Sequence, residues 1–210
     1  MLTLGISTSS GQFALVLGEN RKIIYNSKEF DLNNELDEIL QHALCHCERE
    51  TKDITGIIVD IGPGGTSRVR TGVAFANSLS YASGIPLYPV SSMELAGVDA
   101  WSIHNIPVIS TVKSIKGNAY IGLYSNEQVS IKYGPIDDIA QMTENINEFA
   151  VVGFHREAIM NLPSLKNKFI IDTGMLFGDV RLFIEKEELF KKKKGMKFPY
   201  FAQPVTEQTV

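Results

Sequence analysis

The stretch that decides the fold of this chain is ITGIIVDIGPGGTSRVRTGVAFANSLSYASGIPLYPV, residues 54–90. The apolar run at 54–61 is rich in β-branched residues and indicates a buried strand. It ends at Gly-Pro-Gly-Gly, residues 62–65, where the glycines permit positive φ angles and close backbone approach. A second apolar run at 85–90 indicates the next strand. With a helix between them, the two strands predict a βαβ unit, and hence a parallel or mixed sheet.

The helix between these strands is expected to begin at Thr66 or Ser67 and to run to about Ser83. A hydroxyl at its start can accept an otherwise unpaired backbone N–H, and Gly84 can end it. One narrow face of this helix carries only small side chains. Such a face can pack against its own sheet or against a helix of a partner chain, and both interpretations stay open. These small residues are Gly72, Ala76, Ser80 and Ser83.

The glycine turn also has features of an anion site, because N–H groups at a helix N-terminus bind anions and Arg68 and Arg70 lie nearby in the sequence. No Lys-Ser or Lys-Thr follows the glycines as in a Walker A loop, and the G-x-G-x-x-G spacing of a dinucleotide site is absent. We therefore expect a tight turn and no cofactor. The residues assigned to this glycine loop are Gly62, Pro63, Gly64, Ser67 and Arg70.

The composition is that of an ordinary globular protein, with 44% hydrophobic and 21% charged residues. A net charge of −4 gives no basic footprint for independent binding to nucleic acid. No apolar run reaches the roughly 18–20 residues of a membrane span, and the N-terminus lacks the pattern of a signal peptide. The two cysteines, Cys45 and Cys47, are too close together for an ordinary structural disulfide. We therefore expect a reducing compartment, the cytoplasm.

The first part of the chain predicts three short strands and a helix. Strands at 2–7, 13–17 and 22–25 are separated by turn-forming residues, which favours an antiparallel meander. The helix, at 34–49, has apolar residues at the three- and four-residue spacing of one helical face. Those residues are Leu36, Ile39, Leu40, Ala43, Leu44 and Cys47.

The same helix carries His42 and His46, four residues apart, with Cys45 between them. Histidine and cysteine side chains at such spacing can bind zinc, but zinc sites use three or four ligands. We interpret these residues as a solvated helix edge and predict no metal site.

The order of elements in residues 1–104 is repeated in residues 105–210. Each half is expected to contain three strands, a helix, a strand, a helix and a strand, and the second half ends with one more helix. Two such lobes, each a mixed α/β sheet flanked by helices, predict the duplicated ribonuclease-H-like architecture of sugar kinases, actin and the Hsp70 chaperones. Further expected elements are a helix at 93–101, strands at 107–112, 119–124, 129–133, 149–154 and 169–172, and helices at 135–142, 155–161 and about 177–194.

Three segments resemble the TsaB (YeaZ) family. They are LGISTSSGQFALVL at 4–17, the run at 62–96 from GPGG to SSMELA, and FPYFAQP at 198–204. The resemblance spans the whole chain and is most specific in 62–95, where the family typically has G-P-G-S-F-T-G followed by a hydrophobic residue, R, a hydrophobic residue and G. Matching positions are Gly62, Pro63, Gly64, Ser67 (usually Thr), Arg70 and Gly72, whereas Arg68 replaces a usual glycine.

The resemblance implies a non-catalytic subunit in the synthesis of threonylcarbamoyladenosine on tRNA. TsaB proteins are similar to TsaD, the transferase, whose metal-binding histidines lie in a run like HHMEGH. The corresponding metal positions here are Ser92 and Ala96, neither of which is a usual ligand for zinc or iron. The implied partners are a TsaD-like catalytic subunit, a TsaE-like ATPase, a second copy of the chain and, through the complex only, tRNA.

In the family, pairing uses the first long helix and the helix after the glycine loop, which are residues 34–49 and 67–83 here. The small-residue face described above suits such a helix–helix contact. The residues predicted at this interface are Leu36, Ile39, Leu40, Leu44, Gly72, Ala76 and Leu79.

The chain departs from the family pattern at three places. Ser7 replaces an aspartate that is usual in the first strand, Lys113-Ser114-Ile115 replaces a D-A-R-like run, and Gly153-Phe154 stands where glycine-aspartate is common. Magnesium prefers carboxylate ligands, and Ser7 cannot provide the carboxylate of the aspartate it replaces. This replacement argues against ATP hydrolysis. The alternative function is a small ATPase or kinase-like enzyme that uses the glycine loop and Arg70.

Overall fold

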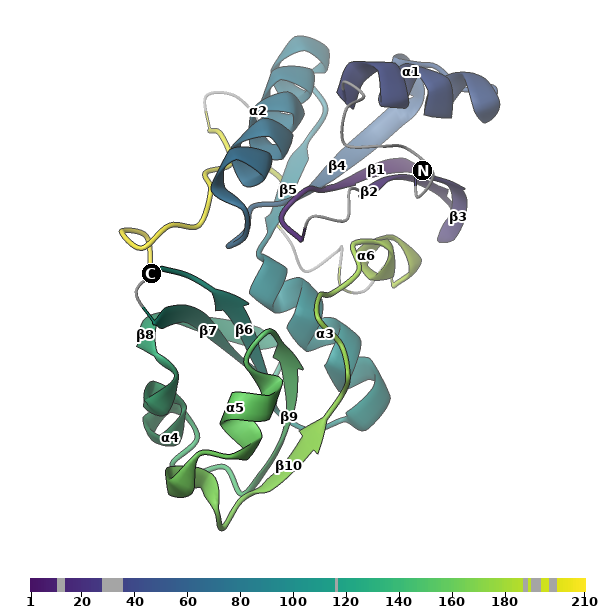
Figure 1. Ribbon diagram of the computed structural model, residues 1–210. Coiled ribbons are helices and arrows are strands. Elements are labelled where there is room, and N and C mark those ends of the chain that lie inside the picture. Colours follow the sequence, from purple (N-terminus) through teal and green to yellow (C-terminus); the bar gives the residue numbers. More distant parts are fainter. Residues whose placement is uncertain (11–13, 28–35, 116, 187–188, 190–193, 197–199) are drawn as a thin grey trace. The chain divides into compact units, whose positions relative to one another are not determined.

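The computed structural model (Figure 1) describes residues 1–10, 14–27, 36–115, 117–186, 189, 194–196 and 200–210. These residues form two compact units, each built around a five-stranded sheet. None of the helices that these residues form is long and apolar enough to cross a membrane. The first unit comprises Met1–Val90 with Val180–Pro204, and the second comprises Ser91–Asp179 with Val205–Val210.

The sheet of the first unit has the strand order β3-β2-β1-β4-β5. Its first three strands form the expected antiparallel meander, while β4 pairs parallel with β1 and β5 pairs parallel with β4. Parallel neighbours need a crossover, and α2 (Thr66–Ser83) supplies it between β4 and β5. The strands are β1 (Leu2–Ser7), β2 (Ala14–Glu19), β3 (Lys22–Asn26), β4 (Ile54–Asp60) and β5 (Leu87–Val90).

Helices α1 (Leu36–His46) and α2 cover one face of this sheet (Figure 1). Strand residues alternate between faces, so Leu2, Leu4 and Ile6 of β1 point toward these helices and join their side chains in one buried cluster. The first turn expected for α1, residues 34–35, and the start of the second strand, residue 13, lie outside the described residues.

The start of α2 differs from the expectation in one respect. The helix begins at Thr66, but Gly65 is its N-cap and no side chain caps it. The Gly65 carbonyl accepts the first helical bond, from the Val69 N–H at 2.9 Å, so the capping position falls on a residue without a hydroxyl. The end is as expected, because Gly84 adopts the left-handed conformation with φ of 67°.

The other face of the first sheet is covered by α6 (Arg181–Glu185), which follows the last strand of the second sheet in the sequence. A side chain on Gly18 would overlap Ile184, and one on Gly5 would lie 3.2 Å from Ile184 Cδ1. The two glycines therefore form the notch that receives Ile184. This helix starts later than the expected residue 177, and most of the lysine run expected at its end, 191–193, lies outside the described residues.

The second sheet has the order β10-β9-β6-β7-β8, with the same pairing directions as the first. The duplicated mixed α/β fold predicted from the sequence is thus confirmed. Two short helices, α4 and α5, cover one face, and α3 covers the other (Figure 1). The elements are β6 (Val108–Lys113), β7 (Asn118–Ser125), β8 (Gln128–Pro135), β9 (Glu148–Gly153), β10 (Phe169–Asp172), α3 (Ser92–His104), α4 (Ile139–Met142) and α5 (Arg156–Met160), with 3₁₀ turns at Thr51–Asp53, Ile136–Asp138 and Pro163–Leu165.

The two units differ from the lobes expected at 1–104 and 105–210. Helix α3 follows β5 of the first sheet but packs on the second, where Gly97 lies against Tyr124. Conversely, residues 180–204 return to the first unit: Met196 forms a β-bridge with Leu87. The second unit thus includes α3, which follows the last strand of the first sheet in the sequence. The first unit includes residues 180–204, which follow the last strand of the second sheet.

Candidate functional site

The glycine loop joins β4 to α2 as a turn packed against the segment that follows β1. Gly62 has a φ of +85°, which L side chains rarely adopt. A Cβ atom on Gly64 would lie 2.5 Å from the Ser9 carbonyl oxygen, and the Gly65 N–H donates to the same oxygen at 3.2 Å. Glycine is thus required for the turn at Gly62 and for close backbone approach at Gly64.

Asp60, which ends β4, ties this turn to β1. Its carboxylate is 1% exposed and accepts hydrogen bonds from Ser7 Oγ at 2.8 Å, from Ser9 Oγ and from the Gly62 N–H at 2.9 Å. Buried carboxylates need such partners, because desolvation otherwise disfavours the charge. Sequence reasoning missed Asp60, although an acid placed directly between an apolar strand and a glycine turn was a signal for it.

Three of the four residues of the small-residue face of α2, Gly72, Ala76 and Ser80, are buried within the chain, and Ser83 is exposed. Thr8 Oγ1 donates to the Arg68 carbonyl oxygen at 2.7 Å, and a Cβ atom on Gly72 would lie 2.5 Å from this hydroxyl. Ala76 is fully buried in the core cluster of the first unit. Of the two interpretations of this face, packing within the chain is the one observed.

The polar residues of the glycine loop lie at the surface. Ser67, Arg68 and Arg70 are exposed on the first turns of α2, whereas Gly62 and Pro63 are buried. The N–H groups of Gly62 and Gly65 donate to protein acceptors. The loop therefore uses at least these two donors to hold its own turn.

The apolar residues of α1 that were predicted at an interface pack onto their own sheet. Ile39, Leu40 and Leu44 belong to the same buried cluster as β1, β2 and β4, and Leu79 of α2 is half-buried against it. Leu36 is buried as well, with 8% of its surface exposed. Direct contact of these side chains with a partner stays a prediction, and the structure gives each of them a packing role inside the first unit. The four α1 residues are Leu36, Ile39, Leu40 and Leu44.

A different set of α2 residues faces outward, which we call the exposed α2 face. Its members recur at spacings of three and four residues and so lie on one side of the helix. Most are small; the large ones are Arg70 and Tyr81, and 63% of the Tyr81 surface is exposed. The set is Arg70, Thr71, Ala74, Ser78, Tyr81 and Ala82.

The two histidines of α1 form a small aromatic cluster with Tyr25 of β3. The His42 and His46 rings stack at 6.3 Å between centroids, and the Tyr25 hydroxyl lies 3.1 Å from His42 Nδ1. Among the described residues, no group of three or more His, Cys, Asp or Glu side chains could hold a metal ion.

The remaining departures from the family pattern gather at the ends of β6 and β9 in the second unit. Phe154 is 51% exposed and packs edge-on against Phe177, with ring centroids 5.4 Å apart. Next to it, burial and, secondarily, the charge of Lys113 lower the pKa of His155. The Nδ1 atom of His155 is buried without a hydrogen-bond partner within the part of the chain that the structure describes.

Known proteins similar to this chain carry names from tRNA threonylcarbamoyladenosine synthesis. The family model of TsaD, tRNA N6-adenosine threonylcarbamoyltransferase, matches residues 31–167. The transferase of that name from Thermodesulfovibrio yellowstonii is 33% identical over 112 residues, covering 45% of this chain and 34% of the relative. The biosynthesis protein TsaB of Bacillus subtilis is 34% identical over 85 residues, covering 40% of this chain and 36% of the relative. The chain thus spans about a third of the length of either relative.

The solved structure of YeaZ from Pseudomonas aeruginosa has the same fold over nearly the whole chain. The TM-score is 0.78 at 17% sequence identity, and the match covers 98% of this chain and 99% of YeaZ. The family match, the TsaB relative and this shared fold agree with the resemblance drawn from the sequence. The chain belongs to the family described by the TsaD model.

Proposed function

We propose that this chain is a non-catalytic scaffold that pairs with and activates a TsaD-like threonylcarbamoyl transferase in tRNA modification. The observation that carries the proposal is the exposed α2 face on an 18-residue helix. Thr71, Ala74, Ser78 and Ala82 project little from the helix, so the backbone of a partner helix can approach closely. Tyr81 beside them can supply the large buried anchor that interfaces favour.

The structure of α3 supports the non-catalytic part of this proposal. The two positions that correspond to the metal ligands of TsaD lie one turn apart at the start of this helix, as Ser92 and Ala96. Ala96 is buried, and a Cβ atom on Gly178 would overlap the backbone of Leu95 and Ala96. The segment around Gly178 therefore packs directly on the helix, where a catalytic relative would need imidazole ligands.

The environment of Asp60 supports the proposal that this chain does not hydrolyse nucleotides. Its carboxylate is committed to two hydroxyl donors and one N–H donor within the protein, so it is not free to hold a magnesium ion. We accordingly place the chemistry on the TsaD-like partner. A TsaE-like ATPase and tRNA join through that complex, and a second copy of the chain occupies the α2 face when the partner is absent.

The experiment is size-exclusion chromatography with light scattering, on the chain alone and mixed with the TsaD homologue of the same organism. The proposal predicts a one-to-one complex in the mixture. Two variants locate the contact: Ser78→Arg places a long charged side chain on the exposed α2 face, and Ser102→Arg makes the same change at an exposed position of α3.

We expect Ser78→Arg to lose the complex and Ser102→Arg to keep it, while both retain the circular dichroism spectrum of the wild type. Equal binding by both variants would place the contact elsewhere. Absence of any complex with the wild-type chain at tens of micromolar would overturn the scaffold proposal.

A further inference from the structure

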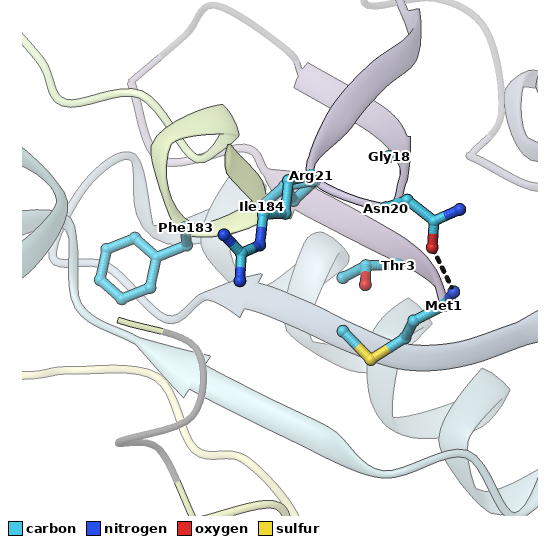
Figure 2. Close-up of a pocket in the computed structure, with 7 residues that line it drawn as sticks. All are labelled: Met1, Thr3, Gly18, Asn20, Arg21, Phe183 and Ile184. Atoms are coloured by element: carbon cyan, nitrogen blue, oxygen red, sulfur yellow. Dashed lines mark hydrogen bonds between the residues drawn. The ribbon is translucent and has the colours of Figure 1, made fainter. Parts of the chain in front are cut away.

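A pocket of about 220 Å³ lies in the first unit, on the face of the sheet that α6 covers. Figure 2 shows the seven residues that line it, which come from β1 and the residue before it, from β2 and the turn that follows it, and from α6. No element of the glycine loop or of the exposed α2 face takes part. The lining residues are Met1, Thr3, Gly18, Asn20, Arg21, Phe183 and Ile184.

The pocket exists because glycines flank Thr3 on both neighbouring strands. Thr3 is paired with Gly18 of β2 and with Gly56 of β4, so neither cross-strand neighbour fills the space beside it. Ile184 of α6 occupies part of the resulting hollow, in contact range of Gly18. Since α6 has only five residues, it covers the hollow incompletely.

Thr3 provides a buried polar group directed into this pocket. Leu2 and Leu4 point to the opposite face, toward α1 and α2, so alternation places the Thr3 side chain on the α6 side. Thr3 is only 3% exposed, yet its hydroxyl makes no hydrogen bond within the described parts of the chain. Its Oγ1 atom is not one of the fully buried atoms that lack a partner among the described residues, so the hydroxyl is open to the pocket and can hydrogen-bond a ligand there.

The rim carries a cation in an unusual backbone conformation. Asn20 and Arg21 form the turn between β2 and β3 with φ angles of 51° and 68°, where the second position favours glycine. Arg21 instead brings a guanidinium group to the pocket, and Figure 2 shows its side chain directed from the hairpin toward α6. A guanidinium has five N–H donors, so it can meet an anion in addition to protein partners.

The apolar part of the lining is the side chain of Ile184, whereas the ring of Phe183 is buried and points away from Thr3 in Figure 2. The pocket thus combines a hydrophobic wall, a hydroxyl at its floor and an arginine at its rim. We propose that it binds a small carboxylate, of about the size of an amino acid, that carries a short apolar body and a second hydrogen-bonding group. The carboxylate meets Arg21, the apolar body lies on Ile184, and the second group pairs with Thr3. This inference goes beyond the scaffold role and does not depend on pairing.

The test is titration of the ¹⁵N-labelled full chain with 3-hydroxybutyrate, followed by NMR amide shifts. Butanamide is the uncharged control ligand. We expect saturable shifts clustered at Thr3, Gly18 and Arg21, with a dissociation constant of about 1 mM or below for a ligand of this size. Butanamide should bind at least about tenfold more weakly, because it lacks the charge-assisted bonds to the guanidinium.

Two variants and their controls separate binding from folding. Thr3→Val keeps the side-chain shape and removes a hydroxyl that has no internal partner, so it should weaken binding about fivefold or more without lowering thermal stability. Arg21→Gln should weaken binding about tenfold, whereas Lys22→Gln, the same change at the next residue, should leave it unchanged. Absent shifts, shifts that cluster elsewhere, or equal affinities of the Arg21 and Lys22 variants would each overturn the proposal.

Discussion

Substituting Gly72 by alanine has two opposite effects on the free energy of unfolding, and the contacts of Gly72 in the structure determine which is larger. In a helix interior, alanine is more favourable than glycine by about 1 kcal/mol, which predicts a more stable protein. Here, however, the added Cβ atom would lie 2.5 Å from Thr8 Oγ1 and 3.0 Å from Thr8 Cγ2. The Thr8 side chain must move, and its hydroxyl is the donor to the Arg68 carbonyl oxygen.

The destabilising effects are the larger ones. Loss of the hydrogen bond costs about 0.5–1.5 kcal/mol, and overpacking of a filled site costs about 1–3 kcal/mol. After subtraction of the gain in helix propensity, we expect Gly72→Ala to lower the free energy of unfolding by about 2 kcal/mol. The same substitution in a Thr8→Ala background should be neutral or stabilising, because the clashing atoms are gone.

Urea unfolding followed by circular dichroism measures all four proteins of this double-mutant cycle. Fluorescence of Trp101, the single tryptophan, reports on α3 of the second unit and serves as a control for effects away from α2. The expected coupling between the two positions is about 2 kcal/mol. A stabilising effect of Gly72→Ala in the wild-type background, or the same loss in both backgrounds, would refute this account of the small-residue face.

Four further substitutions test other parts of the structure. Arg21→Gly relieves the strain of a positive φ angle and should raise the free energy of unfolding by about 0.5–1 kcal/mol in urea titrations. Glu127, at the corresponding turn of the second sheet, has a φ of 63°, and Glu127→Gly should have the same effect. Because the pKa of His155 is lowered in the fold, the unfolded chain takes up this proton first as the pH falls, so stability is lost from about pH 6.5 downward. His155→Gln should therefore show a smaller drop in melting temperature than the wild type between neutral and acidic pH, and an equal drop would contradict the assignment. Asp60→Asn removes a charged acceptor from two hydroxyls and an N–H, and calorimetry should show a loss of about 1–3 kcal/mol.

The sequence predicted the sheet well because its signals are local. The β-branched run before the glycine turn, the amphipathic pattern of α1 and the left-handed Gly84 each depend on residues close in the chain. The repeated order of elements then gave the duplicated fold, which the common strand order confirms. The placement of α3 and α6 escaped prediction, because apolar periodicity shows that a helix has a buried face but not which sheet buries it.

The candidate interface shows a second limit of the sequence. Ile39, Leu40 and Leu44 satisfy the same periodicity whether they meet their own sheet or a partner, and only the structure shows them in the core. The face around Gly72 is likewise filled by Thr8, which is 64 residues away. The exposed α2 face was hidden because alanine and serine give little hydrophobic signal.

The most direct test of the central claim is the rate of threonylcarbamoyl transfer to tRNA by the TsaD homologue, measured with and without this chain. We expect no activity for this chain alone, a clear rate increase when it is added, and no increase with Ser78→Arg. Transfer by the chain alone, or a TsaD rate that the wild-type chain leaves unchanged, would contradict the account.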